Sequence, residues 1–143
     1  MELDNIDLKI LDLLKENGRM SHEAIAGQVN LSRPAVRSRI LSLEQQKIIT
    51  GYATEIDYSK LGYPIQVLIY LKLNDTNYKK IMAQLEKVYL EDIMRYSHYR
   101  MSGEWCILLK VMSRSQAGLT KYLDLLQEID GIVATNTVFL FNS

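Results

Sequence analysis

The sequence feature that most constrains the fold is a change of hydrophobic period between residues 47 and 65. Before it, apolar residues recur at steps of three and four, as on a helix face; after it, alternating runs typical of strands appear as well. A chain of 143 residues can form two small domains. Gly62 and Pro64 lie in the intervening stretch and favour a linker. We therefore predict one domain over residues 1–57, a linker over 58–64 and a second domain over 65–143.

The first domain is predicted to contain three short helices. Asp4, Ser21 and Ser32 each precede a helical stretch and can accept a hydrogen bond from its first backbone N–H groups. Pro34 suits the first turn of the third helix, where its missing N–H costs nothing. The β-branched and aromatic residues over 48–57 then predict a short strand or hairpin, the wing of a winged helix-turn-helix.

The second domain combines strands and helices. Strands are predicted at residues 65–73, 93–101, 105–112 and 132–141, with helices at 77–89 and 116–129. This βαββαβ order is the ferredoxin-like arrangement, with two helices on one face of an antiparallel sheet. In the first strand, Val67 and Ile69 alternate with Leu68 and Tyr70, so both faces are apolar. The predicted class is therefore α+β, with the open sheet face covered by a second copy of the chain.

The charge balance directs attention to the third helix. The chain has 17 basic and 17 acidic residues, so any contact with a polyanion depends on a local patch. Residues 33–47 contain four basic residues and one acidic residue, whereas residues 1–55 contain seven basic and eight acidic. A helix that begins with a hydroxyl cap and carries arginines in its first two turns fits the DNA major groove. We therefore expect double-stranded DNA to be a partner.

Arg33 and Arg37 lie four residues apart and form the core of the predicted DNA contact. Arg39 lies beside the apolar stripe, so pairing with Glu44 or with an acidic residue of the first helix is an alternative for it. The full set of predicted DNA contacts is Ser32, Arg33, Pro34, Ala35, Arg37, Ser38, Arg39 and Lys47.

A small-molecule site is expected in the second domain. The turn Ser102-Gly103-Glu104 offers backbone N–H groups for a carboxylate and a carboxylate for an ammonium. Thr135 and Thr137 on the last strand complete the predicted site. The alternative is a hairpin turn that needs glycine for its positive φ, with threonines chosen for strand propensity.

The remaining polar residues predict no other chemistry. Cys106 is the single cysteine, and with only His22 and His98 it favours neither a disulfide nor a metal site. We expect Cys106 to pack as a small apolar residue, His22 to be exposed, and no cofactor or catalytic residue to be present. The sequence has no apolar run near the roughly 18 residues of a membrane helix, and its acidic start is unlike a secretion signal, so we expect a cytoplasmic protein.

The chain resembles the Lrp/AsnC family of leucine-responsive and asparagine-responsive regulators. The residues that match the DNA-binding half are Asp4, Asp7, Ile10, Leu11, Asn17, Gly18, Arg19, Ser21, Ala26, Leu31, Ser32, Val36, Arg39, Ile40, Leu43, Glu44 and Ile48. The join matches at Gly51, Tyr52, Ile56, Asp57, Leu61 and Gly62, and the second half at Ser102, Gly103, Gly131, Ile132, Thr135 and Thr137. The resemblance implies a regulator that binds promoter DNA as a dimer, or as a tetramer or octamer, and responds to an amino acid or related small metabolite.

The sequence differs from the family pattern at four positions. Asn30 and Lys47 stand where glycine is common, and Asn30 tolerates the same left-handed conformation. Glu104 and Cys106 stand where members that bind amino acids usually have aspartates. This difference supports an alternative interpretation, an effector-independent architectural protein of the same fold that wraps DNA.

Overall fold

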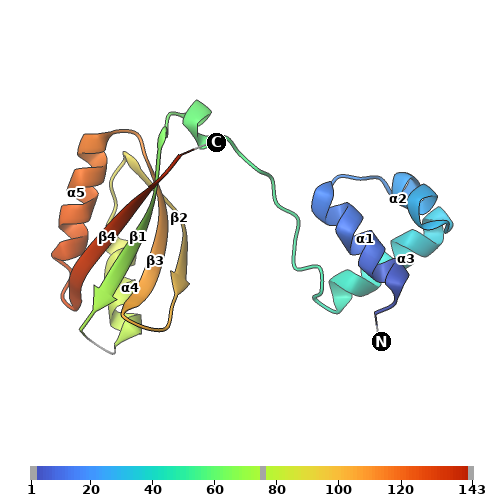
Figure 1. Ribbon diagram of the computed structural model, residues 1–143, viewed down its shortest axis with the longest axis horizontal. Helices are drawn as coiled ribbons and strands as arrows, with labels where there is room; N and C mark the ends of the chain where they lie inside the picture. Colours follow the sequence, from blue (N-terminus) through green and yellow to red (C-terminus); the bar gives the residue numbers. More distant parts are fainter. Residues whose placement is uncertain (1–2, 75–76, 142–143) are drawn as a thin grey trace. The chain divides into compact units, whose positions relative to one another are not determined.

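The computed structural model describes residues 3–74 and 77–141 (Figure 1). The outer ends of the two predicted domains, residues 1–2 and 142–143, lie outside the described residues. The chain forms two compact units, residues 1–55 and 56–143, and each is described by itself. The first contains three helices, and the second a four-stranded sheet with two helices, so the fold class is α+β as predicted.

The first unit consists of α1 (Asn5–Glu16), α2 (His22–Val29) and α3 (Arg33–Gln45). All three predicted caps are confirmed. Asp4 and Asp7 form a capping box, in which each side chain accepts a hydrogen bond from the other residue's backbone N–H. The Ser21 hydroxyl accepts from the backbone N–H of Ala24, and the Ser32 hydroxyl from that of Ala35. These caps fix where α2 and α3 begin.

The turn between α2 and α3 has the predicted left-handed residue. Asn30 has φ 55° and ψ 43°, and its N–H bonds to the carbonyl oxygen of Ala26. The N–H of Leu31 reaches the same oxygen at 3.2 Å. This tight turn lets the apolar faces of the three helices meet in one core, formed by Ile10, Ile25, Ala26, Val29, Val36, Ile40 and Leu43.

The predicted strand or hairpin over residues 48–57 is absent, and residues 51–57 have no regular secondary structure. A strand needs a neighbouring strand for its backbone hydrogen bonds, and this unit supplies none within the described residues. Tyr52 instead turns back onto the helices, where its hydroxyl donates to Glu44 Oε1 at 2.9 Å. Its ring lies near Gly18.

The second unit begins with a short 3₁₀ helix, η1 (Tyr58–Leu61), inside the segment predicted as a linker. The elements that follow are β1 (Ile65–Leu73), α4 (Tyr78–Lys87), β2 (Ile93–Arg100), β3 (Trp105–Ser113), α5 (Gln116–Gln127) and β4 (Ile132–Leu140). The sheet is antiparallel in the order β2-β3-β1-β4, which confirms the ferredoxin-like prediction.

Helices α4 and α5 cover one face of this sheet and leave the other face open (Figure 1). On one face Val67, Ile69 and Leu71 are fully buried in a core shared with α4 and α5. On the opposite face Leu68 and Tyr70 alternate with them and are only half-buried. No helix in the described part of the chain is long and apolar enough to cross a membrane.

Candidate nucleic-acid interface

The solvent side of α3 is a ridge of exposed residues at helical spacing. Arg33, Pro34, Arg37 and Ser38 are all exposed, whereas Ala35 is half-buried. Val36, Ile40 and Leu43 anchor the opposite side of the helix in the core. The capped N-terminus and the buried stripe therefore hold the two arginines outward, in the first two turns of the helix.

Within the described residues, the two ridge arginines lack an acidic partner. Neither Arg33 nor Arg37 forms an ion pair with any of the described residues. Each guanidinium has five N–H donors in a fork that matches a phosphate or the O6 and N7 atoms of guanine. The ridge can therefore offer both guanidinium groups to an anion or to a base edge.

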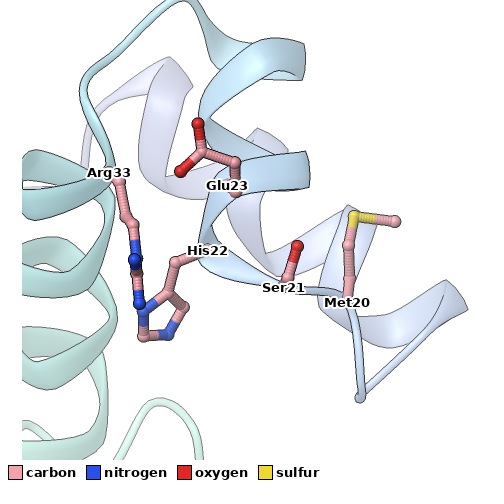
Figure 2. Close-up of a pocket in the computed structure, with 5 residues that line it drawn as sticks. All are labelled: Met20, Ser21, His22, Glu23 and Arg33. Carbon is pink, nitrogen blue, oxygen red and sulfur yellow. The ribbon is translucent and has the colours of Figure 1, made fainter.

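A cavity of about 500 Å³ lies between the start of α2 and the start of α3. It is lined by Met20, Ser21, His22, Glu23 and Arg33. Figure 2 shows the Arg33 side chain extending from α3 toward the His22 ring from the first turn of α2. The sequence analysis predicts no function for His22. Its position directly after the Ser21 cap, at the start of α2, is the sequence feature that could have indicated its place in this cavity.

Arg39 is turned away from this ridge. It pairs with acidic residues at the start of the first helix, which is one of the alternatives to a DNA contact that the sequence predicts. Its Nη1 donates to Asp7 Oδ1 at 2.7 Å and to Asp4 Oδ2 at 2.8 Å. The hydrogen bond to Asp7, followed by the one to Asp4, raises the pKa of Arg39. The pKa of Asp4 is lowered, chiefly by the backbone N–H of Asp7 and then by Arg39. Arg39 thus joins α3 to the start of α1, and we remove it from the DNA contacts.

Lys47 lies just beyond α3 and has a left-handed backbone, with φ 58°. Its N–H bonds to the carbonyl oxygen of Glu44, and the N–H of Ile48 bonds to that of Leu43, each at 3.0 Å. This pattern closes the helix as a Schellman motif does, with lysine where glycine is usual. The Lys47 side chain is exposed.

The predicted effector residues fall into two groups. Gly103 has φ 102°, a conformation that favours glycine. This agrees with the alternative interpretation, in which the glycine serves the hairpin turn rather than a ligand. Glu104 accepts a hydrogen bond from Lys72 Nζ, and this contact lowers the pKa of the Glu104 carboxyl. The thiol of Cys106 lies 3.5 Å from the carbonyl oxygen of Gly103. Lys72 is the neighbour that sequence reasoning missed, because only the sheet register brings it to this turn.

The two threonines lie on the other side of β1 from this turn. Thr135 pairs with Leu71 and Thr137 with Ile69 across the β1–β4 ladder. Residues directly opposite each other share a face, so both threonines lie on the side covered by helices. The Thr135 hydroxyl accepts from Gln127 Nε2 of α5 at 3.4 Å. Two strand spacings, about 10 Å, separate β4 from β3, so the threonines and the turn do not form one compact cluster.

Two family models match the chain, one in each unit. Residues 3–44 match the AsnC-type helix-turn-helix domain, and residues 66–143 match the Lrp/AsnC ligand binding domain. An uncharacterised HTH-type transcriptional regulator of Pyrococcus furiosus is 32% identical over 137 residues, which cover 96% of this chain and 90% of that protein. The HTH-type transcriptional regulator LrpC of Bacillus subtilis is 30% identical over 125 residues, covering 87% and 83%.

Solved structures agree with these matches. The structure of B. subtilis LrpC superposes with a TM-score of 0.83 at 28% identity, covering 100% of this chain and 97% of that one. The structure of E. coli AsnC superposes with a TM-score of 0.81 at 29% identity, covering 100% and 95%.

Proposed function

Because the chain belongs to the Lrp/AsnC family of HTH-type transcriptional regulators, and is a DNA-binding regulator with a ligand-binding domain, we propose that α3 is its recognition helix. The observation that carries the proposal is the exposed Arg33–Arg37 ridge, which forms no ion pair with the described residues, on a helix capped by Ser32. The proposed contacts are Ser32, Arg33, Pro34, Ala35, Arg37, Ser38 and Lys47. In this proposal the protein regulates transcription and catalyses no reaction. It binds promoter DNA in the cytoplasm.

Two kinds of contact are expected within this set. We expect Arg37, in the second turn, to reach a base edge in the major groove. Arg33, the Ser32 hydroxyl and the His22 ring lie at the start of α3 and of α2, where a helix crossing the backbone meets phosphate. Glu23 lines the same cavity and disfavours a second phosphate there. Base contacts give specificity, whereas phosphate contacts set the position of the helix.

We propose that the chain acts as a dimer through the open face of its sheet, and that dimers associate further into tetramers or octamers. The support is the half-buried apolar pair Leu68 and Tyr70 and, beside Leu68 on β4, the exposed Val138. A symmetric dimer presents two recognition helices to successive major grooves, about 34–36 Å apart. The operator is then expected to be a pseudo-palindrome.

We propose that an amino acid or related small metabolite binds at the Ser102-Gly103-Glu104 turn. Glu104 is held as a carboxylate beside Lys72, so it can accept from an ammonium group. A ligand that also touches Thr135 and Thr137 must reach across β1 to β4. The second candidate is the effector-independent architectural protein, which Cys106 in place of the usual aspartate favours. Stabilisation of the chain by one amino acid in a thermal-shift series would support the sensor, because a ligand raises stability only where it binds.

The DNA proposal is tested by selecting preferred sites from random DNA and then comparing variants on the selected site. Arg37→Ala is expected to weaken binding by roughly 1–3 kcal/mol, about five- to 150-fold, if Arg37 forms a bidentate base contact. Arg33→Ala is expected to weaken binding to all sequences and to lower the salt slope by about one, as a phosphate contact does.

Lys15→Ala is the matched control, since Lys15 is an exposed cation of the same unit on α1. It should leave DNA affinity unchanged, and light scattering should find the same assembly for all three variants. Equal DNA binding by Arg37→Ala and wild type would contradict the placement of α3 in the groove.

A further inference from the structure

A cavity of about 310 Å³ lies at one end of the second unit, between the end of α4, the start of β2 and the side of α5. Its lining residues are Glu86, Val88, Tyr89, Leu90, Ile93, Met94, Arg95 and Tyr122. This volume is at the lower end of the range for small-molecule sites in proteins.

One residue of the lining, Tyr122, has a buried hydroxyl with no well-formed hydrogen bond among the described residues. Tyr122 is 1% exposed. Burial raises the pKa of Tyr122, while the charge of Arg95 and its N–H contact with the hydroxyl oxygen oppose that rise, so the O–H stays neutral at physiological pH and its own proton is left to donate. An unsatisfied buried hydroxyl is costly, so a ligand that accepts from it recovers a hydrogen bond that the free protein lacks.

Arg95 adds a positive charge beside this hydroxyl. Its Nη1 donates to the carbonyl oxygen of Leu85 near the end of α4, at 2.9 Å. A guanidinium has five N–H donors, so donors remain beyond the bond to Leu85 and the contact with the Tyr122 hydroxyl. The bond to Leu85 also orients the guanidinium, so its remaining donors are held in place rather than free to move through solvent.

We propose that this cavity binds a small carboxylate with a short apolar chain. The carboxylate accepts from the Tyr122 hydroxyl and the Arg95 guanidinium, and the chain lies against Val88, Leu90 and Ile93. Two converging donors, one of them charged, suit a carboxylate better than a neutral group. Glu86 stands among the same lining residues and disfavours a second negative charge on the ligand.

This site is separate from the turn proposed for the effector. Strand β2 runs from the cavity, where Ile93 pairs with Ser113, to Arg100 just before that turn. Eight strand residues span about 25 Å, at roughly 3.3 Å per residue. Binding in this cavity therefore does not depend on the proposed DNA contacts or on the Glu104 site.

The test is calorimetric titration of the full chain with acetate, butanoate and 4-methylpentanoate, in a buffer free of carboxylates. Affinity is expected to rise along the series, by about fourfold for each added methylene that is buried. The neutral analogue 4-methylpentan-1-ol should bind more weakly than 4-methylpentanoate, because it cannot pair with Arg95.

Tyr122→Phe is the deciding variant, because it removes only the buried hydroxyl. Without ligand its thermal stability should equal or exceed that of wild type, so the variant is expected to fold. Its affinity for 4-methylpentanoate should fall about tenfold, the effect of losing one hydrogen bond to a charged group. Tyr99→Phe, at an exposed tyrosine on β2, is the matched control and should bind as wild type does.

Three results would overturn the proposal. One is equal affinity of wild type and Tyr122→Phe, and another is no binding by any carboxylate of the series at millimolar concentration. The third is loss of binding in Glu104→Gln while Tyr122→Phe binds normally, which would place the ligand at the turn.

The required chemistry, a carboxylate on a short apolar chain, is common to amino acids and to simple carboxylic acids. Titration of wild type and Glu86→Gln with leucine and with 4-methylpentanoate separates these two sources. If the ligand is an amino acid whose ammonium group pairs with Glu86, Glu86→Gln should lower the affinity for leucine alone. If the ligand is a simple carboxylic acid, Glu86→Gln should bind 4-methylpentanoate at least as tightly as wild type does. Tyr122→Phe must weaken whichever compound binds.

Discussion

Lys47 is held in a backbone conformation that its side chain disfavours. It and Asn30 are the two non-glycine residues with positive φ in the described parts of the chain. A left-handed conformation costs an L-residue other than glycine, asparagine or aspartate roughly 1–2 kcal/mol. Lys47→Gly is therefore expected to raise the free energy of unfolding of the first unit by about 1 kcal/mol, measured by urea denaturation.

The control for Lys47→Gly is Lys47→Ala. Alanine removes the charge but keeps the β-carbon, so stability should stay within about 0.5 kcal/mol of wild type. DNA affinity should fall equally in both variants if the Lys47 charge contacts phosphate. Equal stability of the glycine and alanine variants would show that the backbone at this position carries no strain.

Gly118 and Gly27 are glycines inside helices with opposite surroundings. A β-carbon on Gly118 would lie 2.7 Å from Asp92 Cβ and 3.1 Å from Ser115 Oγ, whereas one on Gly27 would meet nothing within 4 Å. Gly118→Ala should therefore lower stability by about 1–3 kcal/mol, as overpacking does. Gly27→Ala should raise it by about 0.5–1 kcal/mol through helix propensity. Thermal unfolding of the two variants measures both effects, and a stabilised Gly118→Ala would contradict the close packing of Asp92.

The contact between α3 and α1 depends on one guanidinium and two carboxylates. Asp7 is 1% exposed, so its charge has little access to water, while the Arg39 side chain is 27% exposed. Arg39→Gln leaves a buried carboxylate without its cation. We expect a loss of roughly 2 kcal/mol, below the 3–5 kcal/mol of a fully buried pair because Arg39 is partly solvated. Urea denaturation monitored by helix circular dichroism measures the loss, and unchanged stability would show that Arg39 does not join the two helices.

The same contact predicts a dependence on pH. The pKa of Asp4 is lowered in the folded chain from its ordinary value of 3.8. A lowered pKa means that the contribution to stability is complete above the ordinary pKa and is lost as pH falls through the lowered one. Wild type should therefore lose stability below about pH 4 more steeply than Arg39→Gln. Parallel acid-unfolding curves for the two proteins would contradict this role of Asp4.

Local interactions explain which elements could be predicted from the sequence. The caps at Ser21 and Ser32 depend on residues three positions away, and each was predicted correctly. Arg39 could be assigned only to alternatives, because its partners lie 32 and 35 residues away. The wing was predicted wrongly because strand propensity over 48–57 says nothing about whether a partner strand exists. For Tyr122 the sequence predicts only a place in the helix over residues 116–129, since the burial of its hydroxyl appears only in the packed structure.

For the whole molecule, the proposed dimer depends on the open face of the sheet. Val138 and Phe139 are neighbours on β4 and are both 41% exposed. Val138 pairs with Leu68 and shares the open face with it, whereas Phe139 pairs with Val67 on the face covered by helices. Since the two residues are equally exposed in one subunit, an aspartate at either should have a similar effect on its folding. Their effects on assembly should differ.

Val138→Asp is expected to convert the dimer into monomers, because a two-fold interface receives the new charge twice and buries both copies. Phe139→Asp is the matched control and should keep the dimer, as measured by light scattering after size exclusion. A monomer carries one recognition helix and loses the joint binding of two half-sites, so Val138→Asp should also bind the selected DNA at least tenfold more weakly. If both variants stay dimeric, the open face is not the interface. If Val138→Asp is monomeric but binds DNA as tightly as wild type, a single helix-turn-helix is sufficient for recognition.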